Sequence, residues 1–147
     1  MMNTIMYISI IMIKIGLNGF GRIGRSITRI VSNAKDIKLV VVNEINQDIE
    51  NLAYLIKYDT IYGKLNKKVR VNKNKNIIQI DNNKIKFFSK TKIHEVEWNK
   101  FGIDLLIDAT GTEINVINSR KVLGKKLSKV IITHSPDKYV DNTLIIG

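Results

Sequence analysis

The sequence predicts an α/β fold with a mostly parallel β-sheet and helices on both of its faces. Residues 13–42 follow the pattern of a strand, a helix and a second strand, and short apolar runs recur at 103–107 and 130–133. Continuous apolar runs are typical of strands that are buried on both faces of a parallel sheet. A strand–helix–strand unit of this length implies a parallel pair of strands with a right-handed crossover.

The first strand is expected over Ile13–Asn18 and is followed by a helix over Arg22–Asn33. Four apolar residues of this helix share one face, which we expect to be buried: Ile23, Ile27, Ile30 and Val31. The second strand is expected over Ile37–Val42, where only Lys38 interrupts the apolar run.

A second helix is predicted to begin after Asp48, whose carboxylate can cap it, and to run through Ile56. Its inward-facing residues are expected to be Leu52, Leu55 and Ile56. A loop is expected over 58–63. From Val69 to Phe88 the apolar residues alternate, with Asn-rich turns at 72–76 and 82–83. This alternation predicts a small antiparallel meander.

The last third of the chain predicts a strand over Ile103–Ile107, a helix over Ile114–Leu123 and a strand over Val130–Thr133. A final strand is expected over Thr143–Ile146. We assign residues 12–147 to one domain and residues 1–11 to an N-terminal extension, and translation from Met12 instead of Met1 is an open alternative.

Composition excludes several classes of function. The chain has no cysteine, so these residues offer neither a disulfide nor a thiolate, and we expect no metal site. No apolar run is long enough for a membrane helix and no signal-peptide pattern is present, so we expect a cytosolic protein without a membrane partner. The net charge of +11 raises the alternative of a basic scaffold that binds RNA. Because the lysines are scattered and not interleaved with aromatic residues, we expect solvated surface and no nucleic-acid partner.

The segment from Gly19 to Gly24 matches the pattern G-x-G-x-x-G between the first strand and the first helix. Gly19 would permit the tight turn, Gly21 would let the backbone approach a pyrophosphate, and Gly24 would let the helix pack close to the sheet. The free backbone amides of Arg22 and Ile23 would then face the phosphates at the positive end of the helix dipole.

Glu44 follows the second strand, where an acidic side chain can accept hydrogen bonds from an adenosine ribose. The same carboxylate would repel a 2′-phosphate, so NAD is expected in preference to NADP. A glycine turn beside a solvated glutamate, without any ligand, is the alternative. Strand, glycines, helix, strand and acid nevertheless follow in the order of the dinucleotide-binding fingerprint, which predicts a Rossmann-type NAD-binding domain.

The stretch from Ile13 to Arg25 resembles the opening of glyceraldehyde-3-phosphate dehydrogenases more closely than a general dinucleotide-binding pattern does. The resemblance covers residues 12–147 and continues at Asn43-Glu44, 55–60, Gly63, Trp98, 108–111 and 129–133. It implies cofactor contacts from Thr110 and Gly111 along the cleft and from Thr133 near the nicotinamide, besides those already named. Thr110 as a plain cap of the following helix stays an alternative. An arginine near the adenine, common in the family, is Thr91 here, which implies somewhat weaker binding.

Within this family, the sequence is more similar to the erythrose-4-phosphate dehydrogenase branch. The stretch 130–147 aligns with that branch without a gap, and its serine-histidine pair matches Thr133-His134. Asn43-Glu44 also favours that branch, since glycolytic members more often carry Asn-Asp. The expected function is therefore oxidation of a sugar-phosphate aldehyde, erythrose 4-phosphate or glyceraldehyde 3-phosphate, with hydride transfer to NAD.

The family's chemistry needs a cysteine in a Ser-Cys-Thr-Thr-Asn-type motif, which we expect beyond Gly147. The chain is accordingly expected to be C-terminally truncated, to lack the catalytic domain and catalytic residues, and to be inactive alone. His94 and His134 do not match the family's catalytic histidine, and the family's tetramer is not expected of this shorter chain. A stand-alone nucleotide-binding module and an inactive gene fragment are the alternatives.

Overall fold

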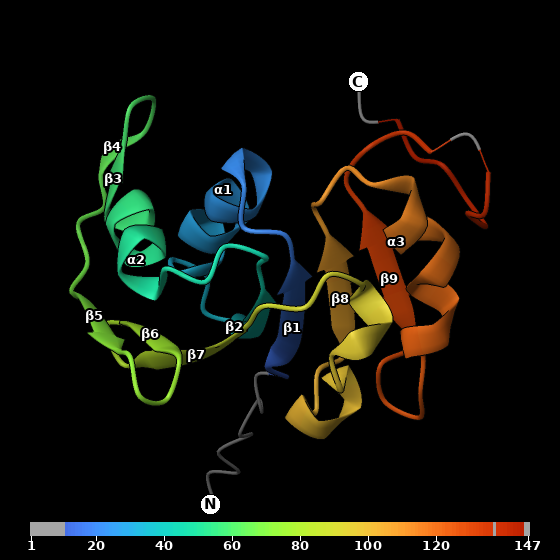
Figure 1. Cartoon of the computed structure of the whole chain (residues 1–147), viewed down its shortest axis with the longest axis horizontal. Helices are drawn as coiled ribbons and strands as arrows, with labels where there is room; N and C mark the ends of the chain where they lie inside the picture. Colours follow the sequence, from blue (N-terminus) through green and yellow to red (C-terminus); the bar gives the residue numbers. More distant parts are fainter. Residues whose placement is uncertain (1–10, 137, 146–147) are drawn as a thin grey trace, which may run out of the picture.

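The computed structural model describes residues 11–136 and 138–145. It contains a seven-stranded sheet in the order β5-β6-β7-β2-β1-β8-β9 and a separate two-stranded hairpin, β3-β4 (Figure 1). The strands of the large sheet are β1 Ile13–Asn18, β2 Ile37–Asn43, β5 Val69–Asn72, β6 Ile77–Ile80, β7 Asn83–Phe88, β8 Leu105–Asp108 and β9 Lys129–Ile132. The hairpin strands are β3 Tyr58–Asp59 and β4 Gly63–Lys64. The α-helices are α1 Arg22–Val31, α2 Ile49–Lys57 and α3 Glu113–Asn118, and the 3-10 helices are η1 Ile93–Glu95, η2 Trp98–Phe101 and η3 Ser119–Val122.

Strands β7, β2, β1, β8 and β9 run parallel to one another, whereas β6 pairs in antiparallel fashion with β5 on one side and with β7 on the other. The predicted α/β class, with a mostly parallel sheet and a small antiparallel meander, is therefore confirmed. The chain passes from β1 to β2 on one side and returns to β8 on the other side of β1. In open parallel sheets, such a reversal of strand order opens a crevice at the carboxyl ends of the strands, and ligands bind there.

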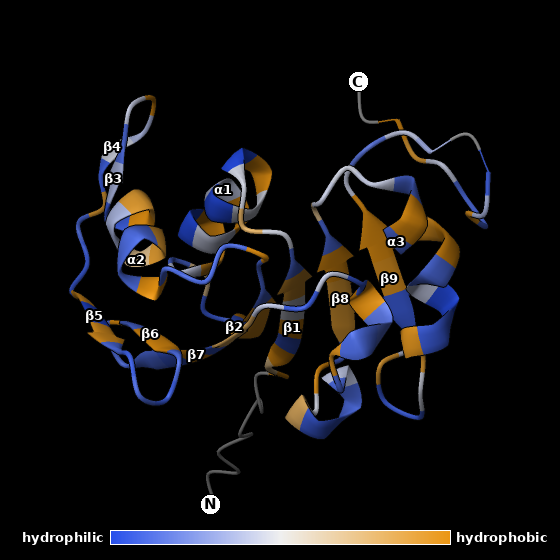
Figure 2. Cartoon of the chain, in the orientation of Figure 1, coloured by the Kyte–Doolittle hydropathy of each residue, from blue (hydrophilic) through white to orange (hydrophobic). Residues whose placement is uncertain are grey.

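Two apolar cores cover the two faces of the sheet. The first lies under α1 and α2 and includes Leu17, Leu39 and Ile56. The second lies under the 3-10 helices and includes Trp98, whose ring is 1% exposed and whose Nε1 donates to the carbonyl oxygen of Ile93 at 2.6 Å. Apolar residues concentrate in the strands β1, β8 and β9, and the turns of the meander are hydrophilic (Figure 2). The central strands β1 and β2 are consequently buried from both sides toward their carboxyl ends, as their apolar runs predicted, whereas the edge strand β9 is only partly buried, with Ile131 48% exposed.

The buried face of α1 differs from the predicted one. Ile23 is 53% and Ile30 70% exposed, whereas Gly24, Thr28 and Val31 are buried. Gly24 determines this rotation, because a Cβ atom there would lie 2.2 Å from the carbonyl oxygen of Gly19. The helix can approach the sheet this closely only with Gly24 turned inward, and residues one and two turns later follow it to the same side.

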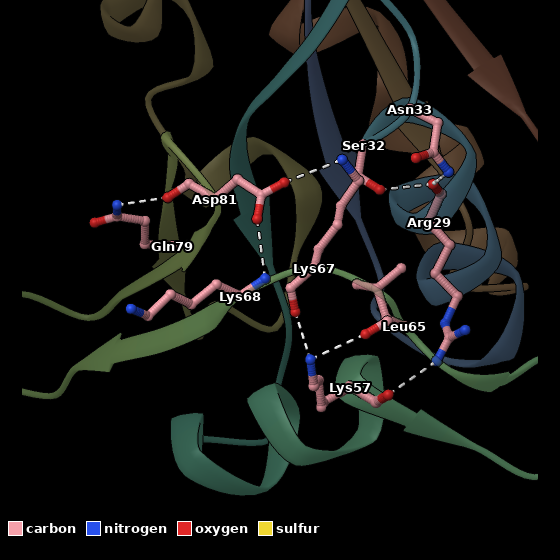
Figure 3. Close-up of polar contacts among 9 residues, drawn as sticks. All are labelled: Arg29, Ser32, Asn33, Lys57, Leu65, Lys67, Lys68, Gln79 and Asp81. Carbon is pink, nitrogen blue, oxygen red and sulfur yellow. Dashed lines mark hydrogen bonds and ion pairs between the residues drawn. The ribbon is translucent and has the colours of Figure 1, made fainter.

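Arg29 joins α1 to the end of α2. Its Nη2 donates to the carbonyl oxygens of Ile56 at 2.9 Å and Gly63 at 2.8 Å, and more weakly to that of Lys57 at 3.4 Å. Figure 3 shows this side chain beside Lys57, whose ammonium group donates to the carbonyl oxygen of Leu65 at 2.9 Å. A buried guanidinium therefore satisfies carbonyl groups that the end of a helix leaves without intrahelical partners.

Several element boundaries differ from the predictions. The loop at 58–63 contains the short β3–β4 hairpin, and the strand predicted to begin at Ile103 begins at Leu105. The helix predicted over Ile114–Leu123 is α-helical only over α3 and continues as η3. Residues 143–145 form no strand, and residues 146–147 of that prediction lie outside the described residues, as do residues 1–10 of the predicted N-terminal extension.

The helix at Asp48 agrees with its prediction, because Asp48 caps α2 through a hydrogen bond from the backbone N–H of Asn51 at 3.0 Å. Within the described part of the chain, no helix has the length and hydrophobicity to cross a membrane.

Candidate functional site

The glycine turn lies between the end of β1 and the start of α1, at the carboxyl edge of the sheet. Gly19 adopts a φ of +94°, in the left-handed region that favours glycine. A Cβ atom on Gly19 would lie 2.9 Å from the backbone nitrogen of Thr110, so the turn packs tightly against the segment that follows β8. Gly24 packs against Gly19 from the other side. Both glycines are therefore required by close backbone contacts within the protein.

Gly21 differs from these two glycines because a Cβ atom there would meet no protein atom within 4 Å. Its φ of −67° is also accessible to any residue. Nothing inside the described protein requires a glycine at this position. The open space in front of Gly21 is where a ligand would approach the backbone.

The N-terminus of α1 has no cap from its own sequence. Gly21 is the N-cap and offers no side chain, and no acidic residue lies in the first turn. Arg22 and Ile23 are exposed there. The backbone N–H groups of a first helical turn have no intrahelical partners, and together with the helix dipole they favour a bound anion.

Glu44 points toward the glycine turn. Its Oε2 accepts a hydrogen bond from the backbone N–H of Phe20 at 2.6 Å, and its Oε1 accepts one from the N–H of Asn46 at 3.1 Å. Its own N–H donates to the carbonyl oxygen of Phe88 at 2.9 Å, which ties the end of β2 to the end of β7. Each carboxylate oxygen keeps further acceptor capacity for a hydroxyl group.

The remaining residues expected to bind the cofactor come from β8 and β9. Thr110 and Gly111 follow β8, and a Cβ atom on Gly111, whose φ is +69°, would meet no atom within 4 Å. Thr133 follows β9 and donates its backbone N–H to the carbonyl oxygen of Asp108 at 3.0 Å. The N-cap of α3 is Thr112, not Thr110, which removes the alternative of Thr110 as a plain helix cap. The site residues expected from the sequence thus lie at one edge of the sheet. They occupy the turn after β1, the first turn of α1 and the segments immediately after β2, β8 and β9.

The sequence did not reveal the polar network beneath this edge. Asn18, Asn43 and Asp108, the last residues of β1, β2 and β8, are at most 3% exposed. Asn43 Nδ2 donates to Asn18 Oδ1 at 2.7 Å, and Asn18 Nδ2 donates to Asp108 Oδ1 at 2.7 Å. Thr110 Oγ1 donates to the same carboxylate at 3.0 Å. A polar residue at the end of three successive buried strands was the signal that could have indicated this network.

Burial raises the pKa of the Asp108 carboxyl above its ordinary value of 3.8, although the hydrogen bonds from Asn18 and Thr110 and the nearby His134 oppose the shift. His134 is partly buried, and its Nδ1 has no hydrogen-bond partner among the described residues. His94 lies exposed on η1, before Trp98. Thr91 is exposed, and its hydroxyl donates to Glu95 at 3.2 Å.

Neither of two hollows in the described part of the chain includes the glycine turn. One of about 160 Å³ lies beyond Glu44 and is lined by residues that include Asn46, Gln47 and Ser89. The other, of about 290 Å³, lies at the opposite edge of the sheet, near Ile37 and Asn83. By the general rule for such sheets, a ligand is expected in the crevice along the strand ends, which we call the cofactor cleft.

Comparison with known proteins agrees with this geometry. Residues 13–116 match the family model described as "Glyceraldehyde 3-phosphate dehydrogenase, NAD binding domain". Similar curated proteins include glyceraldehyde-3-phosphate dehydrogenase 1 of Bacillus cereus, 35% identical over 92% of this chain and 40% of the relative. The glyceraldehyde-3-phosphate dehydrogenase of Thermotoga maritima is 37% identical over the same shares. The chain thus spans about 40% of the length of these relatives.

Proposed function

Because the chain belongs to the glyceraldehyde-3-phosphate dehydrogenase family, as its NAD-binding domain, we propose that it holds NAD for the oxidation of a phosphorylated aldehyde. The observation that carries the proposal is the agreement of three features at one place. An uncapped helix N-terminus, the open space at Gly21 and the carboxylate of Glu44 all lie at the glycine turn. The helix N-terminus and the open space match the pyrophosphate of a dinucleotide, and the carboxylate matches its adenosine ribose.

In this proposal, the amides of Arg22 and Ile23 bind the pyrophosphate and Glu44 accepts a hydrogen bond from the ribose. Thr110, Gly111 and Thr133 line the part of the cleft that leads to the nicotinamide. The chain has no cysteine, so these residues are assigned cofactor binding and no bond-making step. The nucleophile and the base of aldehyde oxidation belong to other residues of the enzyme.

Erythrose 4-phosphate is the substrate that we propose first, and glyceraldehyde 3-phosphate is the alternative. Two features support this order: the gapless similarity of 130–147 to the erythrose-4-phosphate branch, with the pair Thr133-His134, and the Asn43-Glu44 pair. The rate of NADH formation with each aldehyde, measured on the protein isolated from its native source, tests the choice. A kcat/KM higher for glyceraldehyde 3-phosphate would reverse it.

Cofactor binding by this chain is tested by titration with NADH and NADPH. Energy transfer from Trp98, the only tryptophan, to the bound nicotinamide gives the signal. We expect NADH to bind at least about 10-fold more tightly than NADPH, because Glu44 repels a 2′-phosphate. Absence of binding of either nucleotide at millimolar concentration would contradict the proposal.

Glu44→Gln is the matched variant for this titration. It keeps a carbonyl oxygen for the N–H of Phe20 and removes the charge. The preference for NADH over NADPH should therefore fall toward one while the glycine turn keeps its conformation.

A further inference from the structure

A continuous set of hydrogen bonds crosses the floor of the cofactor cleft and has Asp108 at its centre. On one side, Asp108 accepts from Asn18, and Asn18 accepts from Asn43. Asn43 in turn holds both backbone groups of Lys90: its Oδ1 accepts from the N–H at 2.8 Å and its Nδ2 donates to the carbonyl oxygen at 2.9 Å. Lys90 follows β7, next to the backbone of Glu44. This arm of the network therefore fixes the segment beside the adenosine end of the cleft.

The other arm runs through Thr110. Its hydroxyl donates to Asp108 and accepts from Asn115 Nδ2 at 3.0 Å. Asn115 Oδ1 then accepts the backbone N–H of Ile93 at 3.0 Å. Asn115 is 4% exposed, and its side chain ties the start of α3 to η1. This arm fixes the turn after β8 that faces the glycine turn.

The acceptor oxygens of Asp108 determine the direction of both arms. An ionised carboxylate only accepts hydrogen bonds, so Asn18 must present its NH₂ group to Asp108 and its oxygen to Asn43. Asn43 must then present its oxygen to the Lys90 N–H. For the same reason the Thr110 hydroxyl must donate to Asp108, which leaves its lone pairs for Asn115.

We propose that Asp108 is a positioning residue of the cofactor cleft, whose carboxylate sets the orientation of the Asn18–Asn43 and Thr110–Asn115 hydrogen bonds that hold the two walls of the cleft. The inference rests on the proposed function, because it assigns these walls to NAD. It goes beyond that function by giving a role to a side chain that has no direct path to the ligand.

An amide at position 108 can still serve both arms, because Asp108 Oδ1 alone accepts from Asn18 at 2.7 Å and from Thr110 at 3.0 Å. Asp108→Asn with its oxygen at that place is therefore the conservative variant. In Asp108→Leu, and equally in Asp108→Ala, the acceptor is lost. The NH₂ group of Asn18 and the hydroxyl of Thr110 then lose their partner, and both arms lose their orientation.

The test is amide hydrogen exchange of the cofactor-free protein, followed at Lys90 and Ile93, whose N–H groups end the two arms. In Asp108→Leu, at least one of these amides should exchange at least about fivefold faster. Asp108→Asn, which keeps the shared acceptor, should keep the protection. Asp104→Asn is the control, because Asp104 is a partly exposed aspartate just before the other end of β8 that accepts from the N–H of Lys14. It should leave both amides unchanged.

NADH affinity is the second readout, and the thermal melt followed by Trp98 fluorescence reports the fold. The Kd for NADH should rise about 5- to 10-fold in Asp108→Leu and stay within about threefold of the wild type in Asp108→Asn. Unchanged protection of both amides in a folded Asp108→Leu or Asp108→Ala variant, or equal loss of protection in Asp108→Asn, would overturn the inference. A wild-type chain that binds no NADH would contradict the proposed function instead, and the exchange measurement would still test Asp108.

Discussion

A substitution at Gly21 should change protein stability and cofactor affinity in opposite directions. Its backbone conformation, φ −67° and ψ −160°, is available to alanine, and the Cβ atom would meet no protein atom within 4 Å. Gly21→Ala should therefore stabilise the cofactor-free fold by about 0.5 kcal/mol, because alanine restricts the unfolded chain more than glycine does. For a domain of this size, the melting temperature should rise by roughly 2 °C.

The same methyl group would occupy the space through which a pyrophosphate reaches the amides of Arg22 and Ile23. Crowding of this kind costs roughly 1–3 kcal/mol, so the Kd for NADH should rise about 5- to 150-fold. The assays are the thermal melt and the NADH titration described above. Gly24→Ala is the matched control with the opposite signature: its Cβ atom would lie 2.2 Å from the carbonyl oxygen of Gly19, so the fold itself should lose stability. If Gly21→Ala bound NADH with the wild-type Kd, the assignment of this space to the pyrophosphate would be refuted.

Variants at three further residues test the fold and its charges. Arg29→Met removes the donor that serves the carbonyl groups of Ile56 and Gly63. The free energy of unfolding in urea should therefore fall by roughly 2–3 kcal/mol. An unchanged urea midpoint would show that water replaces the guanidinium without cost. Asp48→Ala should lower the same free energy by about 1 kcal/mol, whereas Asp48→Asn, which can still cap α2, should stay close to the wild type; equal losses in both would contradict the capping role. Burial raises the pKa of Asp108 in the folded state. Ionisation of Asp108 therefore destabilises the folded protein once the pH rises through that raised pKa. Below the ordinary pKa of 3.8, the carboxyl is neutral in both states and this destabilisation is absent. Asp108→Asn should therefore melt at or above the wild-type temperature at pH 7 and lose this advantage in acid, and a variant that is less stable than the wild type only at neutral pH would contradict the sign.

The parts of the fold that the sequence predicts well are those determined by local patterns. The first strand, the glycine turn, the first helix and Glu44 lie within 32 residues of one another, and each has a local reason for its conformation. The meander follows from period-two alternation and Asn-rich turns. The strand–turn–helix pattern already indicated the cofactor, and the family resemblance added the contacts expected from Thr110, Gly111 and Thr133.

The misjudged face of α1 shows where periodicity is insufficient. Ile23 and Ile30 satisfy helical spacing as well as the buried residues do, yet they face outward. The close approach of two backbones at Gly19 and Gly24 decided the rotation, and apolar spacing does not contain that information. The shortening of the third helix has a different cause. Asn118 and Ser119 donate to backbone carbonyl oxygens of their own helix, at Ile114 and Val116, and such local bonds compete with regular α-helix.

The polar residues at the strand ends are visible in the sequence, but the pairing of their side chains into one network around Asp108 depends on the topology of the sheet. Asn18 and Asp108 are 90 residues apart in sequence. Their side chains meet only because β8 returns to the free side of β1, and nothing in either local pattern specifies that return. Three strands that each end in Asn or Asp become a single network only after the strand order is known.

The most direct test of the account is the change in amide chemical shifts when NADH is added to this chain. If the first turn of α1 binds the pyrophosphate, the N–H signals of Arg22 and Ile23 should shift in a saturable manner. The Phe20 N–H, which donates to Glu44, should shift with the same Kd. Saturable shifts confined to other parts of the chain, or no shifts at millimolar NADH, would contradict it.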